Sequence, residues 1–198
     1  MVKNEINAET VSYAIDKLQS SKNTSKNYIF IDSFGGSVED GVNLINEIQK
    51  HNITCIAQRA YSMAFAILQS CKNRYMLPSG KLMQHQMSFG IQNSLLQVYS
   101  YISYVSQMNS YLTDLQSKKI RIDRDLFIRK TSTDWWLFGE SAVFNNVVDE
   151  LVDVKCSKPL INSNYTQMFH GSKYTYSHCP IIYKEKDKEQ KEKFFLFI

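Results

Sequence analysis

Two short apolar runs, each leading into a helical pattern, constrain the fold of this chain most strongly. Tyr28–Asp32 (YIFID) is almost continuously hydrophobic, and Ile53–Ala57 (ITCIA) follows it after a helix-like stretch. A strand is apolar along its whole length when both of its faces are covered, which is typical of parallel sheets. Strands that alternate with helices along a chain predict an α/β domain built on a mainly parallel sheet.

Hydrophobic periodicity predicts the remaining elements. Apolar residues at helical spacing predict helices over residues 6–20, 38–48, 61–71, 93–118, 123–130 and 139–146. Short apolar runs predict further strands over residues 74–77, 81–85 and 147–152, the first two separated by Pro78-Ser79-Gly80. The helix over 93–118 is the longest, and its many tyrosines suit a partly polar interface better than a helix that only covers its own core.

The composition changes after about Val154. Residues 155–183 lack clear periodicity and are rich in Ser, Asn, Tyr and Lys. Residues 184–193 form a charge run, and Phe194–Ile198 is an apolar end. We therefore expect a core domain over residues 1–154 and a tail over 155–198 that is peripheral or partly disordered.

Composition sets the broad class of the protein. The chain has 198 residues, of which 43% are hydrophobic, and this suffices for one globular core. The net charge of +4 owes much to the lysine-rich run, and no zinc-finger or glycine-rich phosphate motif accompanies it, so we expect no nucleic-acid partner. No apolar run approaches the length of a membrane span, and the first residues lack a signal-peptide pattern. We expect no membrane association and a cytoplasmic location.

The four cysteines, Cys55, Cys71, Cys156 and Cys179, form no CxxC pair. Cys55 and Cys71 lie in apolar stretches, as buried free thiols commonly do. We expect reduced structural thiols rather than a disulfide framework, as in a cytosolic compartment. We also expect no metal ion and no other cofactor.

The glycine pair Gly35-Gly36 follows the first buried strand and precedes a helix. Without side chains, the backbone can turn sharply there and approach a ligand closely. The helix that follows directs its unpaired N–H groups into the same space, which favours the stabilisation of an oxyanion. A plain tight turn followed by a capped helix, with Ser37 and Asp40 at capping-box spacing, explains the same residues without any ligand.

Ser62, His85 and Asp134 supply the residue types of nucleophilic acyl transfer. A serine hydroxyl is a weak nucleophile at neutral pH, so a base must take its proton, and a third group must orient that base. Each residue also has a simpler explanation. Ser62 precedes an apolar helix and suits an N-cap, His85 ends an apolar strand and suits a structural histidine, and Asp134 suits a helix cap. The surrounding segments and their order have to decide between these interpretations.

Five segments in one order resemble the Clp protease proteolytic subunit family, whose members are self-compartmentalising serine peptidases. The segments are IDSFGGSV (31–38), AYSMA (60–64), LMQHQ (82–86), TDWWLFGESA (133–142) and VVDEL (147–151). The resemblance implies a crotonase-like (ClpP-type) α/β spiral of strand–strand–helix units. It also implies that residues 93–118 form the long handle helix that interlocks two rings.

The resemblance implies roles for individual residues. Ser62 would be the nucleophile, His85 the general base, and Asp134 the group that orients His85. The backbone N–H groups of Gly35-Gly36 and Met63 would form the oxyanion hole. The implied protein is a homo-oligomer of stacked heptameric rings that cleaves polypeptides in an internal chamber, fed by an AAA+ ATP-dependent unfoldase.

The chain departs from the family pattern at Phe34, Gln58 and Met87, where the family commonly has Pro, Gly and Pro. None of these differences removes a catalytic group. Because the first helix begins almost at Met1, we expect the family's first strand and N-terminal gating loop to be missing. This expected difference bears on the axial pore and on unfoldase docking.

Three other functions stay open at this point. A non-catalytic ring subunit or assembly protein would keep the fold, although such subunits usually lose a member of the triad. A crotonase-type acyl-CoA enzyme leaves Ser62 and His85 unexplained. A Ser–Lys peptidase with Lys72 or Lys81 as its base leaves the histidine and the aspartate unexplained.

Overall fold

A six-stranded sheet forms the centre of the first of two structural units. The computed structural model of the chain describes residues 1–20, 27–169, 172–181 and 185–186. The first unit comprises Met1–Asp153 and the second Val154–Ile198.

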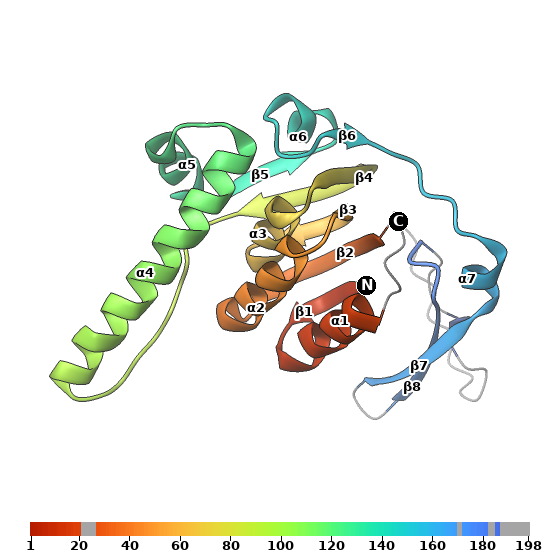
Figure 1. The fold of residues 1–198 in the computed structure, drawn as a ribbon, viewed down its shortest axis with the longest axis horizontal. Helices are drawn as coiled ribbons and strands as arrows, with labels where there is room; N and C mark the ends of the chain where they lie inside the picture. The colour runs from red at the N-terminus through yellow and green to blue at the C-terminus, as the bar shows by residue number, and fades with distance from the viewer. Residues whose placement is uncertain (21–26, 170–171, 182–184, 187–198) are drawn as a thin grey trace, which may run out of the picture. The chain divides into compact units, whose positions relative to one another are not determined.

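The sheet has the strand order β1-β2-β3-β4-β5, and β6 pairs with β4 as well. The strands are β1 (Val2–Ile6), β2 (Asn27–Gly36), β3 (Ile53–Tyr61), β4 (Asn73–Gln84), β5 (Trp135–Phe138) and β6 (Glu150–Leu151). β1 to β4 are parallel neighbours in chain order, whereas β5 is antiparallel to the second half of β4 (Figure 1). The mainly parallel α/β sheet predicted from the apolar runs is therefore confirmed.

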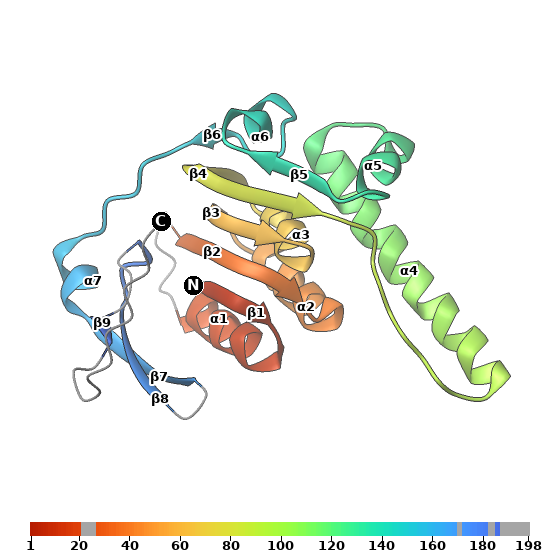
Figure 2. The ribbon, with the colours of Figure 1, turned by 180° about the vertical axis from the view of Figure 1, so that it is seen from behind.

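Helices α1 (Ala8–Ser20), α2 (Val38–Gln49) and α3 (Met63–Ser70) lie along one face of this sheet, and Figure 2 shows the sheet from the opposite side. α3 is buried along nearly its whole length because it packs against β2, β3, β4, α2 and α4. Its Phe65 and Leu68 are fully buried in the core, together with Ile31 of β2. This burial fixes the N-terminus of α3 at the carboxyl end of β3.

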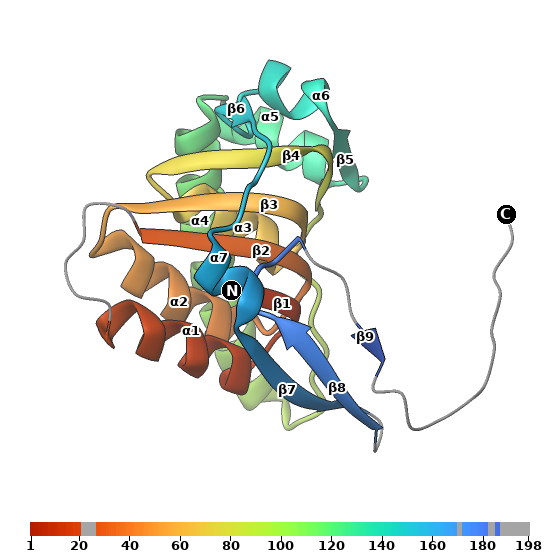
Figure 3. The ribbon, with the colours of Figure 1, turned by 90° about the vertical axis from the view of Figure 1, so that its right-hand side faces the viewer.

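Strand β1 corrects the expectation that the first strand is missing. Val2–Ile6 pairs in parallel with β2, and the first helix begins at Ala8 rather than at residue 6 (Figure 3). Val2 and Ile6 are buried, whereas Lys3, Asn4 and Glu5 between them are not. Only the two ends of the strand contribute to the core. Because three polar residues in a row separate them, the strand contains no apolar run that would predict it.

β4 is one strand where the sequence predicts two. Its pairing with β3 shifts between Ala57↔Met76 and Arg59↔Lys81, so β4 contains three more residues than β3 over this interval. Pro78 and Ser79 are exposed in this bulge. Proline lacks the N–H that a ladder needs, and a bulge accommodates it without ending the strand.

The remaining helices of the first unit are α4 (Leu95–Ile120), α5 (Arg124–Thr131) and α6 (Glu140–Phe144), all close to their predicted ranges. The predicted strand over 147–152 is reduced to β6, because Val147 and Val148 are buried in a turn. α4 projects away from the sheet beyond β4 (Figures 1 and 2). Within the described ranges, no helix combines the length and apolar character needed to cross a bilayer.

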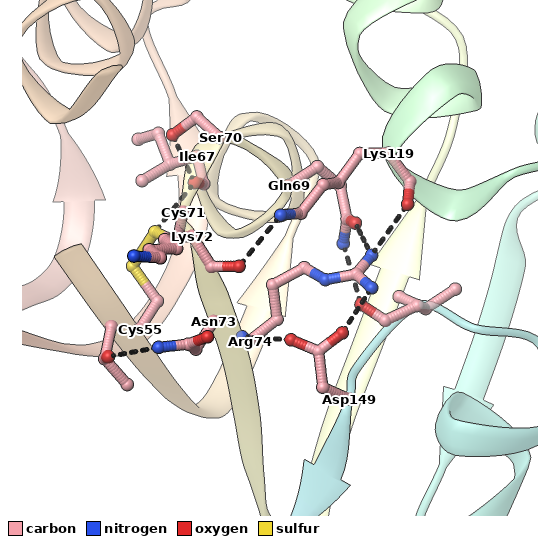
Figure 4. The surroundings of a disulfide bond; sticks show 12 residues. Cys55, Ile67, Gln69, Ser70, Cys71, Lys72, Asn73, Arg74, Lys119 and Asp149 are labelled. Carbon is pink, nitrogen blue, oxygen red and sulfur yellow. Dashed lines mark hydrogen bonds and ion pairs between the residues drawn. A yellow bond between two sulfur atoms is a disulfide. The ribbon is translucent and has the colours of Figure 1, made fainter. Parts of the chain in front are cut away.

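Arg74 at the start of β4 connects this strand to the end of α3 and to the segment before β6 (Figure 4). Its guanidinium is 3% exposed and donates to Asp149 Oδ1 at 2.6 Å, Gln69 Oε1 at 2.8 Å and the Asn146 carbonyl at 3.0 Å. The Arg74 N–H donates to the other Asp149 oxygen at 2.7 Å. Hydrogen bonds to several partners satisfy a buried charge that would otherwise be costly.

Two disulfides contradict the expectation of reduced thiols. Cys55 of β3 is bonded to Cys71 after α3, and Cys156 is bonded to Cys179 in the second unit (Figure 4 shows the first). The Cα–Cα distances of 5.9 and 5.7 Å lie in the usual disulfide range. Spacing along the chain did not predict which cysteines meet in space. The argument from reduced cysteines to a cytosolic compartment loses its support.

The disulfides predict a simple alkylation result. Protein unfolded without reductant should gain no mass from iodoacetamide, and the same protein should gain four adducts after reduction, one for each cysteine. Intact mass spectrometry gives the count. Four adducts without reductant would contradict both bonds, and two would contradict one of them.

The second unit contains regular structure that the sequence pattern does not predict. It consists of α7 (Lys158–Asn162), β7 (Asn164–Phe169), β8 (Ser172–Ser177) and β9 (Glu185–Lys186). The three strands form an antiparallel sheet, and the Cys179 N–H donates to the Leu160 carbonyl at 3.1 Å. Most of the predicted charge run, and the apolar end Phe194–Ile198, lie outside the described residues.

Candidate active site

Ser62 occupies the junction of β3 and α3 in a backbone conformation that side chains rarely adopt. Its φ is 55° and its ψ is −121°. Such conformations cost on the order of 1–3 kcal/mol and persist only where the surroundings enforce them. Here the Ser62 N–H donates to the Met83 carbonyl at 2.9 Å, and the Ser62 carbonyl accepts from the Phe65 N–H at 3.0 Å. A strained strand-to-helix turn of this kind displays a nucleophile.

Gly35 makes room for this turn. Its φ is +97°, and a Cβ there would lie 2.7 Å from the Tyr61 carbonyl oxygen and 2.8 Å from Ser62 Cβ. Only glycine fits such a close approach in this conformation. The Gly35 N–H donates to Ser33 Oγ at 3.1 Å, and that hydroxyl donates to the Asn4 carbonyl at 2.7 Å. β1 therefore supports the glycine turn.

The Ser62 hydroxyl contacts His85 instead of capping its own helix. His85 Nε2 lies 2.8 Å from Ser62 Oγ, and the Ser62 side chain makes no capping hydrogen bond to α3. With a proton on Nδ1, the Nε2 atom accepts the hydroxyl hydrogen, which is the arrangement of a general base. The interpretation of Ser62 as a simple N-cap does not fit this contact.

Asp134 is not bonded to His85. The pairing of β4 with β5 ends at Gln84↔Trp135, and His85 and Asp134 each lie one residue beyond it. The Asp134 side chain is exposed, and within the described part of the chain no hydrogen bond joins it to His85. The structure thus shows a contact between Ser62 and His85, and among the described residues it shows no hydrogen bond from Asp134 to either of them.

Of the predicted oxyanion donors, Gly36 and Met63 share a cavity with Ser62 and His85. The cavity has a volume of about 320 Å³, within the usual range of ligand pockets. Met63 is the first residue of α3, so its N–H has no partner within the helix. Gly35 is not among the residues that line this cavity, and its N–H donates to Ser33 Oγ.

A protein-family model described as Clp protease matches residues 1–155 of the chain. This chain belongs to the Clp protease family. It is 23% identical over 154 residues to an ATP-dependent Clp protease proteolytic subunit of Borrelia garinii subsp. bavariensis, an alignment that spans 75% of this chain and 79% of that protein. It is 26% identical over 130 residues to an ATP-dependent Clp protease proteolytic subunit 2 of Pseudomonas aeruginosa, spanning 63% and 65% of the two chains.

Membership in the Clp protease family confirms the predicted ClpP-type fold and argues for a peptidase rather than an acyl-CoA enzyme. The Ser–Lys alternative finds no support in the geometry. Neither Lys72 nor Lys81 is among the residues that line the cavity holding Ser62. Lys72 and Lys81 are both exposed.

Sequence reasoning missed two glutamines in this Clp protease site. Gln84 and Gln116 are 6% and 3% exposed, line the cavity, and are hydrogen-bonded to each other. The Gln84 side-chain oxygen also accepts from the His85 N–H at 3.2 Å. A signal for them exists. Gln84 follows buried Leu82 by two residues, and Gln116 follows buried Leu112 by four, so both polar residues fall on core-facing positions.

Proposed function

We propose that this chain is a serine endopeptidase that hydrolyses peptide bonds through an acyl-enzyme. The observation that carries the proposal is the 2.8 Å contact between Ser62 Oγ and His85 Nε2 at a strained strand-to-helix turn. Such a turn exposes the hydroxyl of a nucleophilic serine and brings it next to a base, and a serine without a chemical role needs neither. The names of the relatives, proteolytic subunits of ATP-dependent Clp proteases, agree with this chemistry.

The proposed reaction begins when Ser62 Oγ attacks the carbonyl carbon of the scissile bond and its proton passes to His85 Nε2. The negative charge on the carbonyl oxygen is stabilised by the N–H groups of Met63 and Gly36. His85 then gives its proton to the leaving amine as the C–N bond breaks. Water, deprotonated by His85, attacks the ester, and the proton returns to Ser62 as the acid product leaves.

Asp134 is the proposed orienting group for His85. The proposal is supported by their neighbours, because Gln84, the residue before His85, pairs with Trp135, the residue after Asp134. A carboxylate at Nδ1 would hold the tautomer whose Nε2 accepts the serine proton.

The proposed assembly is a homo-oligomer of heptameric rings. Apolar side chains on the first half of α4 support it, because Leu95, Leu96 and Tyr99 are 66%, 79% and 61% exposed. Large apolar side chains that cluster on a surface mark a protein contact. Light scattering should give a mass of many subunits at micromolar concentration, and Leu96→Glu should shift it toward smaller species. A monomer in wild-type protein would contradict the assembly.

An AAA+ unfoldase is the proposed partner, and polypeptides are the proposed substrates. The partnership rests on the words "ATP-dependent" in the names of both relatives.

A non-catalytic ring subunit is the second candidate. The absence of a described hydrogen bond between His85 and Asp134 favours it. The contact between His85 and Ser62 favours the enzyme, because a subunit without chemistry has no need to hold a base on a strained serine.

A fluorophosphonate separates the two candidates. Such a probe forms a covalent bond to a serine only when a base activates it. We expect one adduct by intact mass, mapped to the peptide that contains Ser62, and none in Ser62→Ala. Ser70→Ala, which removes a half-buried hydroxyl at the other end of α3, should label like the wild type. No labelling of folded wild-type protein would favour the non-catalytic subunit.

A further inference from the structure

Two buried carboxamides form part of the cavity wall beside the reactive pair. Gln84 comes from β4 and Gln116 from α4, and both line the same cavity as Ser62 and His85. Gln84 Nε2 donates to Gln116 Oε1, Gln84 Oε1 accepts from the His85 N–H, and Gln116 Nε2 donates to the Leu112 carbonyl at 2.8 Å. This arrangement anchors both side chains in fixed orientations.

The hydrogen-bonding capacity of this amide pair exceeds what its neighbours use. A carboxamide has two N–H donors and an oxygen with two lone pairs. Among the described residues, the contacts of Gln84 and of Gln116 use one N–H and one lone pair of each. A second N–H and a second lone pair therefore stay unused on each buried side chain. Each amide nitrogen and oxygen already has one partner, and the unused N–H and lone pair are available to a group that enters the cavity.

The other residues that line the cavity limit the kind of chemical group that can bind beside the two glutamines. Apolar side chains such as Met63, Leu112 and Phe127 line the cavity together with neutral polar side chains such as Asn109 and Thr131. Among the residues that the structure describes, no Asp, Glu, Lys or Arg lines it. A charged group would therefore enter the cavity without a counter-ion, which is costly. A purely aliphatic group would fit the walls but leave the amides unmatched. A neutral group with both a donor and an acceptor matches both features.

We infer that this cavity is a specificity pocket for the substrate side chain on the acyl side of the scissile bond, and that the Gln84–Gln116 pair selects glutamine or asparagine there. This inference rests on the proposed peptidase function. Sites that hydrogen-bond a polar substrate group reject analogues lacking that group, because the site's own polar atoms are then left unpaired. Net hydrogen bonds of this kind are worth roughly a factor of ten each in selectivity.

The test compares two peptides that differ only at that position, one with glutamine and one with methionine of similar length. In wild-type protein, kcat/KM for the glutamine peptide should exceed that for the methionine peptide about tenfold or more. Gln116→Met keeps the length of the side chain and removes the amide, so the ratio should fall to about one or invert. Gln107→Met, on an exposed position of α4 outside the cavity, should keep the wild-type ratio.

Gln116 is the informative position because Gln84 also contacts the His85 backbone, so a change there would disturb the base. A wild-type ratio near one overturns the inference, and so does a ratio that Gln116→Met leaves unchanged. If Gln116→Met does not fold, the wild-type ratio decides alone. A simple fluorophosphonate distinguishes failure of the pocket from failure of the chemistry. If Ser62 is labelled but the protein shows no preference for glutamine, only the inferred specificity pocket is contradicted. If Ser62 is not labelled and neither peptide is cleaved, the proposed peptidase function is contradicted.

Discussion

His85→Ala should lower peptide turnover by about 10⁴-fold or more, since the members of a catalytic triad act as a unit. The structural reason is the 2.8 Å contact between His85 Nε2 and the Ser62 hydroxyl. The variant should stay folded, because His85 is half-buried and lies just after the end of β4, outside its ladder. Steady-state kinetics and urea unfolding measured on the same preparation check both statements.

The control for this change is His51→Ala. His51 pairs with Glu47 at 3.2 Å on α2 and does not line the cavity, so its loss should leave turnover unchanged. Turnover within tenfold of wild type in His85→Ala would show that another base serves Ser62.

Asp134→Asn completes the comparison. If Asp134 orients His85 during turnover, the variant should lose about 10⁴-fold, as orienting aspartates in such triads do. Asp153→Asn, also an exposed acid, should lose nothing. Turnover at the wild-type rate in Asp134→Asn would assign the orientation of His85 to another contact, with its backbone bond to Gln84 as the first candidate.

Arg74→Met should lower the free energy of unfolding by about 3 kcal/mol, at the low end of the range for a broken buried ion pair. The change leaves Gln69 and the Asn146 carbonyl without their donor. The low end applies because the Asp149 side chain is 37% exposed and can still reach water. Arg124→Met is the matched control, since its pair with Asp114 is exposed on both sides and should contribute less than about 1 kcal/mol.

The pH dependence of stability gives a second measure of the Arg74 network. Burial pushes the pKa of Asp149 upward, but the hydrogen bonds and charge of Arg74 outweigh it and hold the pKa below its ordinary value of 3.8. The associated stability is therefore complete above pH 3.8 and is lost as the pH falls through the lowered value. Arg74→Met should show a smaller loss on acidification than the wild type. Equal losses would contradict the role given to this pair.

The sequence predicted the parts of the fold that rest on local signals. Apolar runs located β2 and β3, and periodicity located α2, α4 and α5. The segments around Ser62 and His85 identified two residues whose side chains are in contact. β1 was not predicted because the residues in its middle are polar. β4 was predicted as two strands because a proline such as Pro78 usually ends a strand. The disulfides, the second sheet and the glutamine pair depend on contacts between segments distant along the chain, which no local pattern encodes.

The exposed bulge around Pro78 divides β4 into two segments with separate tasks. The first segment carries Arg74 and pairs with β6, and the second ends at Gln84, next to His85, and pairs with β5. The bulge therefore separates, along a single strand, the residue that binds Asp149 from the residues beside His85. Because Pro78 and Ser79 are exposed there, substitutions at these two positions should change neither the Arg74 hydrogen bonds nor the contact between His85 and Ser62.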